Sequence, residues 1–280
     1  MMSILVSKST LMREQVQHID QIEQLNAQAL THMQESFRTS SKPIGVVSDI
    51  DEFLVDTVGN HIKFIHRAAG IFGHKGDLPT YEDIVAKGGT AHYAEIFGLK
   101  PEEWEEIMMR VRASRFVNRN APRYHEAPHT ILSAGEYHEL HGFMTAKPGT
   151  ERTLRTTKQD LEQRLGFTEK PVILRPEIVP ISHSSAWKVG LLAKIAAADP
   201  AKALVLTDDS ISTAKAIASH NNQQGRIQLM QVLYPGPLTK GPLERGEYVP
   251  HVEEGIFVAD WEQMPEIFDI IDKTWKRLHN

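Results

Sequence analysis

Apolar residues recur every three or four positions along the first part of the chain, with polar residues between them. They are Val16, Ile19, Ile22, Leu25, Ala29, Met33 and Phe37. This spacing predicts one long amphipathic helix over about residues 8–38. We interpret the stripe first as a face that packs on the following domain. The alternative is a self-association or partner helix that forms a homodimer. Residues 38–43 break the pattern, so residues 1–42 are assigned to a helix and its linker.

Six short apolar runs without polar alternation follow, and helical patterns lie between most of them. The runs are Ile44–Ser48, Leu140–Met144, Val172–Leu174, Ala203–Thr207, Ile227–Leu233 and Ile256–Val258. The helical patterns span Thr150–Leu165, Ser185–Ala198, Ile211–His220 and Trp261–Leu278, with Ser184 as the expected N-cap of the second. Continuous apolar strands separated by helices predict a parallel sheet that is covered on both faces. Right-handed crossovers then make this a doubly wound α/β domain.

The rhythm of strands and helices is interrupted once, between the first and second predicted strands. Thr80 precedes one helical pattern as a cap, and Pro101 begins another that has acidic residues in its first turn. A connection of this length is not a plain loop. We therefore predict a helical cap domain over residues 58–138, above the carboxyl end of the first strand. The α/β core then consists of residues 43–57 and 139–280.

Composition and charge exclude several classes of function. The 280 residues carry a formal net charge of -5, which gives no electrostatic case for binding a nucleic acid polymer or an anionic membrane surface. The absence of cysteine excludes disulfides, thiolate metal sites and cysteine nucleophiles. The apolar run at the N-terminus is too short for a signal peptide, and no window reaches the length of a membrane span. A cytoplasmic protein is the resulting expectation.

Polar side chains gather where the predicted strands end. They are Asp49 and Asp51 after the first strand, Thr145 after the second, Lys188 after the third, and Asp208 and Asp209 after the fourth. Ligands of doubly wound sheets bind outside the carboxyl ends of the strands, so we expect these side chains to lie close together. Paired carboxylates repel each other unless a cation joins them. A ligand set of oxygen atoms alone favours Mg²⁺ over a transition metal.

The order and spacing of these residues resemble the four signatures of the haloacid dehalogenase-like (HAD) superfamily. The corresponding stretches are VVSDID, GFMT, SSAWK and ALVLTDDS. The resemblance covers residues 44–56 and 140 to about 215. Within it, residues 153–176 look like the helix–strand segment that follows the second signature in phosphatase members. It implies a Rossmann-like HAD core with a helical cap inserted between the first and second signatures.

The resemblance also implies a chemistry, that of a Mg²⁺-dependent phosphohydrolase that forms an aspartyl-phosphate. Asp49 would be the nucleophile, and Asp51 would be the general acid and then the general base. Mg²⁺ would be held by Asp49, by the backbone carbonyl of Asp51 and by an aspartate of the fourth signature. Asp208 is the expected direct ligand, with Asp209 binding through water or supporting Asp208.

The phosphoryl group of the substrate has its own expected partners. The Thr145 hydroxyl, the Ala146 backbone N–H and the Lys188 ammonium would hold its oxygen atoms. A cap of the predicted size excludes water and large substrates, so a small phosphomonoester, a metabolite or a nucleotide, is the expected substrate. A phosphotransferase or mutase, which needs an acceptor other than water, is a closely related alternative.

Two residues depart from the family pattern. Members commonly have Gly after the second aspartate, and this chain has Glu52 there, followed by the bulky Phe53. Glycine permits an unusual backbone turn without steric cost, and we expect Phe53 to add bulk just below the site. These departures motivate another alternative: a catalytically weak or inactive HAD-like protein that binds a partner through the N-terminal helix or the cap.

The predicted cap carries scattered basic residues. The arginines at positions 110, 112, 115, 119 and 123 either supply a contact to a second anionic group or form a solvated helix face. Most of the histidines at positions 61, 66, 74, 92 and 125 are interpreted as surface or structural residues, because their spacing gives no metal-site pattern.

Overall fold

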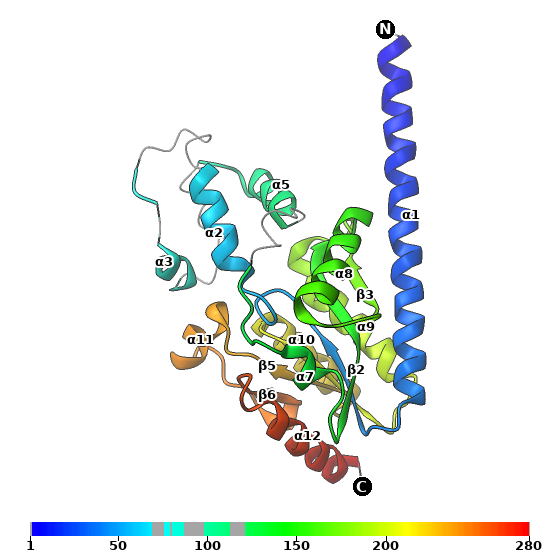
Figure 1. Ribbon diagram of the computed structural model, residues 1–280, viewed down its shortest axis with the longest axis vertical. Coiled ribbons are helices and arrows are strands. Elements are labelled where there is room, and N and C mark those ends of the chain that lie inside the picture. The colour runs from blue at the N-terminus through cyan, green and yellow to red at the C-terminus, as the bar shows by residue number, and fades with distance from the viewer. Residues whose placement is uncertain (1, 69–75, 79, 87–97, 113–120, 280) are drawn as a thin grey trace.

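A six-stranded sheet in which every pair of neighbouring strands is parallel forms the centre of the computed structural model (Figure 1). The structure describes residues 2–68, 76–78, 80–86, 98–112 and 121–279. The strands are β1 (Ile44–Ser48), β2 (His138–Pro148), β3 (Val172–Arg175), β4 (Ala203–Asp208), β5 (Leu229–Leu233) and β6 (Ile256–Val258). Their spatial order is β3-β2-β1-β4-β5-β6, so the direction of winding reverses next to β1. The predicted doubly wound α/β fold is confirmed.

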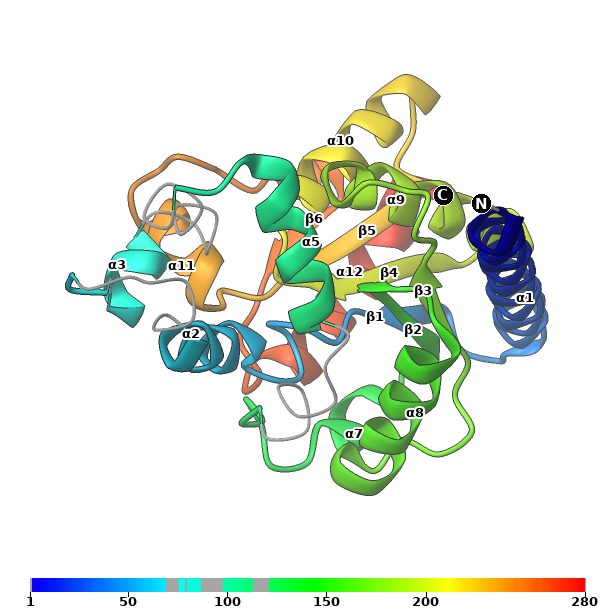
Figure 2. The ribbon, with the colours of Figure 1, turned by 90° about the horizontal axis from the view of Figure 1, so that it is seen from above.

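Helices cover both faces of this sheet (Figure 2). One face packs against α7 (Pro128–Leu132), α8 (Glu151–Leu165) and α12 (Met264–His279). The other face packs against α1 (Met2–Thr39), α9 (Ser184–Ala196) and α10 (Ile211–Gln224). The strands contribute side chains to the apolar cores on both faces of the sheet. Ile44 and Val46 belong to the core on the first face, and Val47 belongs to the core on the second. Both faces of β1 are therefore apolar, which explains its uninterrupted apolar sequence.

The observed elements match the predicted ones closely, with small differences at their ends. Strand β1 has its predicted bounds, and β2 extends beyond the predicted run in both directions. Ser184 was predicted as the N-cap of α9, and this is wrong: the helix begins at Ser184, and His183 occupies the cap position without a capping hydrogen bond from its side chain. The short 3-10 helix Ile181–His183 leads directly into α9, which leaves Ser184 already in helical geometry.

Helix α1 is an integral layer of the core over its second half. Ile22, Met33 and Phe37 are buried, as the predicted stripe requires. The helix lies so close to the sheet that a Cβ atom added at Gly45 of β1 would clash with the Phe37 ring, and one added at Gly142 of β2 would clash with Met33. The interpretation that the stripe packs on the following domain is confirmed from Ile22 to Phe37, and the side chains of Val16 and Ile19 lie outside the described part of the structure. The first half of α1 extends past the sheet (Figure 1), and a homodimer through this helix stays a prediction.

The insertion after β1 is helical in the part that the structure describes. It contains α2 (Thr57–Ala68), α3 (Tyr81–Ala86) and α5 (Pro101–Arg112), which share a small apolar cluster of their own. Thr80 caps α3 as predicted, because its hydroxyl accepts from the Asp83 N–H at 3.1 Å. The cluster also takes in Leu238 from α11 (Pro237–Glu244), a helix of the core. The insertion thus has its own small core and rests on α11.

The chain returns to the main domain before β2 begins. Ala121 and Leu132 belong to the core cluster on the α8 side of the sheet, although both lie within residues 58–138. The described return segment therefore packs with the α/β core rather than with the helices of the insertion.

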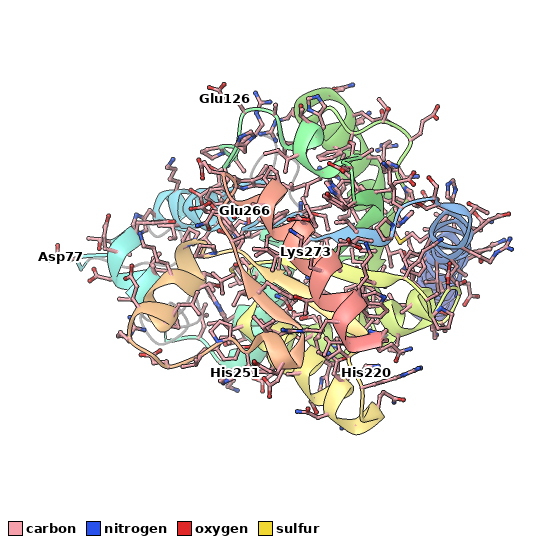
Figure 3. The ribbon with its side chains drawn as sticks, turned by 90° about the horizontal axis from the view of Figure 1, so that it is seen from below. Asp77, Glu126, His220, His251, Glu266 and Lys273 are labelled. Carbon is pink, nitrogen blue, oxygen red and sulfur yellow. The ribbon has the colours of Figure 1, made fainter. Side chains whose placement is uncertain are left out.

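The outer face of α12 carries charged side chains. Glu266 and Lys273 on α12 point away from the sheet (Figure 3). Within the described parts of the chain, each helix falls short of the length or the apolar character that crossing a bilayer demands.

The packing of α1 leads to a test by substitution. We expect Phe37→Ala to lower the free energy of unfolding by about 3–5 kcal/mol, because the ring is fully buried against β1 and leaves a cavity. Leu278→Ala is the matched control: its side chain is 45% exposed on α12, and we expect a change below about 0.5 kcal/mol. Urea denaturation of both variants measures these values, and equal effects would contradict an integral role for α1.

Candidate active site

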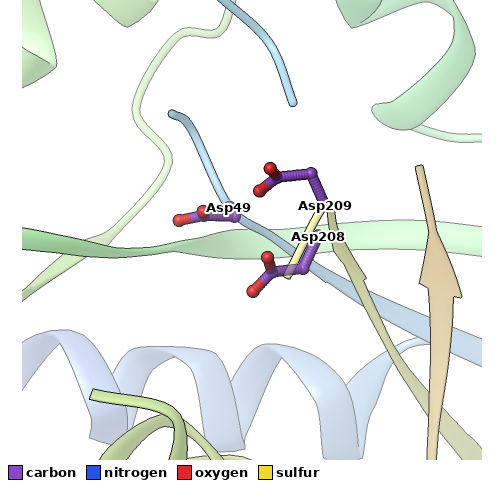
Figure 4. Close-up of side chains that lie close together, drawn as sticks. All are labelled: Asp49, Asp208 and Asp209. Atoms are coloured by element: carbon purple, nitrogen blue, oxygen red, sulfur yellow. The ribbon is translucent and has the colours of Figure 1, made fainter. Parts of the chain in front are cut away.

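Three aspartates meet where β1 and β4 end. Asp49 follows β1, Asp208 is the last residue of β4, and Asp209 follows it. Because β1 and β4 are neighbours with Ser48 paired to Thr207, the next residue of each strand lies at the same edge of the sheet. Carboxylate oxygens of the three aspartates lie within 4.8 Å of one another, and all three residues are buried (Figure 4). The expected convergence of the first and fourth signatures is therefore present.

Lys188 supplies the positive charge that holds two of these carboxylates. It lies on α9, is buried, and places Nζ 3.1 Å from Asp49 Oδ1 and 2.7 Å from Asp208 Oδ2. Burial alone would lower the pKa of the lysine, but the charges of Asp208 and Asp49 outweigh burial and raise that pKa. Lys188 is therefore a fixed cation in the site.

Three carboxylates against one ammonium leave an excess of negative charge. Burial, together with the nearby Asp208 and Asp51, raises the pKa of Asp49 to about 7, against the opposing charge of Lys188. Burial and the charges of Asp208, Glu52 and Asp49 raise the pKa of Asp209 well above its usual range. When all three carboxylates are ionised, the excess over Lys188 equals the charge of a divalent cation. The donor set, made of oxygen atoms alone, fits Mg²⁺.

Asp51 belongs to a second group of residues beside this cluster. Its Oδ2 accepts from the Thr145 hydroxyl at 3.0 Å, and its Oδ1 lies 3.1 Å from Lys147 Nζ. Burial would raise the pKa of Asp51, but Lys147, His61 and Thr145 together outweigh burial and lower that pKa. The three carboxylates that lie close enough together to hold a metal are those of Asp49, Asp208 and Asp209, without the Asp51 side chain. The backbone carbonyl of Asp51 as a ligand stays a prediction.

The ends of β2 and β3 carry two residues that the sequence alone did not single out. Lys147 is buried two positions after Thr145, and its N–H donates to the Thr145 hydroxyl at 3.2 Å. Arg175, at the end of β3, is also buried and donates from Nε to the Ala146 carbonyl at 3.1 Å. The Gly149 N–H donates to the Arg175 carbonyl at 2.8 Å. These bonds fix the irregular last residues of β2, which include Ala146. The Ala146 N–H stays a predicted phosphate contact.

Phe53 occupies the core beneath the site. It is fully buried, its ring stacks on Trp261 with centroids 4.8 Å apart, and its centroid lies 5.7 Å from that of Tyr234 in an edge-to-face arrangement. Glu52 has φ 58°, the left-handed conformation that glycine adopts without cost. The unusual turn is therefore kept without glycine, and the Phe53 side chain is directed into the core.

The insertion contributes one buried residue close to Asp51. His61 on α2 is 6% exposed, and a positive charge on it favours the ionised form of Asp51, lowering the pKa of that carboxyl. Arg123 lies in the return segment and donates to the carbonyls of Glu126 and Arg164, so its guanidinium holds backbone there. The side chains of Arg110 and Arg112, and residues 74, 92, 115 and 119, lie outside the described part of the structure.

Comparison with known proteins gives a likeness of fold. No protein-family model matches the chain, and no curated protein matches it. A solved structure described as a haloacid dehalogenase-like hydrolase from Burkholderia xenovorans LB400 is 15% identical, with a TM-score of 0.44 over 81% of this chain and 98% of its own. A second, described as a β-phosphoglucomutase from Bacteroides vulgatus, is 15% identical, with a TM-score of 0.41 over 91% of this chain and 100% of its own. At these identities and TM-scores neither likeness carries an argument about this chain, and any function rests on the site residues.

The carboxylate cluster leads to a metal-binding test. We expect Mg²⁺ to raise the midpoint of thermal unfolding, because the ion binds the folded cluster and not the unfolded chain. At 100 times the dissociation constant the gain is about 2.7 kcal/mol. Asp208→Asn should remove most of this Mg²⁺-dependent shift, whereas Asp269→Asn, at an exposed ion pair with Lys273, should keep it. An equal shift in both variants would place the bound ion elsewhere.

The Asp51–Lys147 pair leads to a double-mutant cycle. With Asp51→Asn, Lys147→Met and the double variant, we expect a coupling free energy of about 1–3 kcal/mol, because both charges are largely removed from water. The exposed pair Lys240–Glu244, with Nζ and Oε1 3.9 Å apart, is the matched control and should couple by less than about 0.5 kcal/mol. Chemical denaturation measures both cycles, and equal coupling would mean that Lys147 does not fix Asp51.

Proposed function

We propose that this protein is a Mg²⁺-dependent phosphohydrolase of the HAD type that acts on a small phosphomonoester. One observation carries the proposal: Asp49, Asp208 and Asp209 share one sheet edge with Lys188 bound between two of them. Thr145 at the end of the neighbouring strand β2 completes the set and is joined to Asp51. This combination matches what transfer of a phosphoryl group to a carboxylate requires.

Asp49 is the proposed nucleophile. Attack by one of its carboxylate oxygens on phosphorus forms an aspartyl-phosphate and releases the alcohol portion of the substrate. Asp49 must be ionised for this step, and Lys188 favours that form. Bound Mg²⁺, held by Asp49, Asp208 and Asp209, would neutralise charge on the phosphoryl oxygens. The Asp49 N–H donates to the Thr207 carbonyl at 2.8 Å, which fixes the nucleophile against β4.

Asp51 is the proposed proton-transfer residue. It gives a proton to the leaving alkoxide and later takes one from the water that attacks the aspartyl-phosphate, so protons balance over the two steps. In the structure Thr145 and Lys147 hold Asp51, and both favour its ionised form. Phosphoryl oxygens compete for the same two donors when substrate binds. The pKa of Asp51 then rises, which prepares it to act as an acid.

The insertion supports a small substrate. Helix α2 begins eight residues after Asp49 and carries the buried His61 close to Asp51, so it leaves little room for a large phosphorylated surface. A metabolite or nucleotide is therefore proposed rather than a phosphoprotein. The alternative of a catalytically weak or inactive binding protein was motivated in part by Phe53. This side chain packs into the core and leaves the residues of the four signatures in place, which weakens that alternative.

Phosphate release tests the proposal. With Mg²⁺ and a panel of small phosphomonoesters, we expect turnover that falls by more than about 10³-fold in Asp49→Asn. In Asp51→Asn the expected loss is about 10²–10⁴-fold. Asp269→Asn should retain full activity. Equal phosphate release by wild type and Asp49→Asn would reject the mechanism, and a phosphorylated product formed when sugars or alcohols are added would indicate a phosphotransferase.

A further inference from the structure

Glu52 stands at the junction between the core and the insertion. Its side chain is 6% exposed, and its backbone turns in the left-handed region with φ 58°. Its N–H donates to the Val55 carbonyl at 2.9 Å, which closes a tight turn directly after Asp51. This turn directs the glutamate carboxylate into the space between the two connections of the insertion, where burial raises the pKa of Glu52 to about 8.

One carboxylate oxygen binds the outgoing connection. Glu52 Oε1 accepts from the Val58 N–H at 2.6 Å and from the Thr57 hydroxyl, at the first residues of α2. The first N–H groups of a helix lack partners within the helix, so an acceptor at this end fixes where the helix begins and how it leaves the core. Asp56, the residue before the helix, accepts from the Gly59 N–H at 2.8 Å, and Glu52 adds a second acceptor from the core turn.

The other carboxylate oxygen binds the returning connection. Tyr124 donates its hydroxyl to Glu52 Oε2 at 3.1 Å, and its backbone N–H donates to the Leu54 carbonyl at 3.2 Å. The Asp56 N–H donates to the Pro122 carbonyl at 2.8 Å, so the two connections run side by side. The Tyr124 ring also contacts Tyr234, with centroids 5.5 Å apart. Both ends of the insertion are therefore tied through a single side chain.

We propose that Glu52 is a positioning residue that ties the two connections together and thereby sets the orientation of α2 over the candidate active site. Helix α2 carries the buried His61 and begins only six residues after Asp51, so a change in the start of α2 moves this buried side chain relative to the site. The purpose of this orientation rests on the proposed function, whereas the bridge itself is a property of the fold. A carboxylate suits the role, because its two oxygens accept from three donors on two segments.

Hydrogen exchange on the full chain tests the bridge without any assay of activity. We expect Glu52→Ala to speed exchange of the Val58 N–H about tenfold or more, because its acceptor is gone. Glu52→Gln keeps an acceptor oxygen and should change this exchange by less than about threefold. Exchange of the β4 amides should stay at the wild-type rate in both variants.

Two further variants make the result decisive. Glu169→Ala is the matched control, because Glu169 has φ 56° and is exposed outside the insertion. It should leave Val58 exchange unchanged. Tyr124→Phe removes one hydroxyl and should speed exchange in the return segment about threefold with the fold intact. Unchanged Val58 exchange in a folded Glu52→Ala would overturn the proposal. If that variant does not fold, unchanged return-segment exchange in Tyr124→Phe would do so.

Kinetics separate this role from a general effect on stability. If wild type releases phosphate, we expect the factor by which Glu52→Ala raises KM to be several-fold larger than the factor by which it lowers kcat. The reason is that closure of the insertion over the bound substrate is affected. Glu52→Gln should restore the wild-type KM. Equal loss of kcat in Glu52→Ala and Glu52→Gln would contradict positioning through hydrogen bonds. If wild type is inactive on every substrate, the exchange experiment still decides whether the bridge exists.

Discussion

The burial of several like charges at one sheet edge is the constraint on which the site depends. Asp49, Asp208 and Asp209 are removed from water within 4.8 Å of one another, where carboxylates repel strongly. Lys188 offsets part of this repulsion through its two ion pairs, and α9 must keep its place against β4 for that ammonium to reach them. The position of α9 is thus tied to the electrostatics of the strand ends, and a divalent cation would complete the balance.

The second aspartate of the first signature is separated from this repulsion by its own partners. Lys147 and Thr145 neutralise and bind Asp51, so two carboxylates that are two residues apart in sequence occupy different electrostatic environments. Opposite shifts of two neighbouring carboxyl pKa values are typical of sites in which one group attacks and the other transfers protons. Burial sets the direction of the pKa shift at Asp49, whereas at Asp51 the combined effect of Lys147, His61 and Thr145 outweighs burial.

The strands and most of the site residues could be predicted from the sequence, because both follow from the residue pattern of short stretches of the chain. Apolar runs located β1 and β4, and the topology of a parallel sheet then placed Asp49 beside Asp208. Lys147 was missed because its role depends on the irregular end of β2, where Arg175 from the next strand holds the backbone. The hydrogen bond between Tyr124 and Glu52 could not be predicted either, because the two residues are 72 positions apart and meet only after the insertion folds.

The turn after Asp51 shows how a departure from a family pattern can be compensated. A non-glycine residue in the left-handed region costs roughly 1–2 kcal/mol. A hydrogen bond within a protein contributes about 0.5–1.5 kcal/mol net. The Glu52 side chain receives three such bonds, from Thr57, Val58 and Tyr124, so together they offset the strain that its own backbone introduces. A glycine would remove the strain and the bonds together. The Val58 N–H and the Thr57 hydroxyl at the start of α2 would lose their acceptor, while Asp56 would keep its bond to the Gly59 N–H. Glu52 therefore adds a side-chain bridge to the backbone hydrogen bonds that already join the two connections of the insertion.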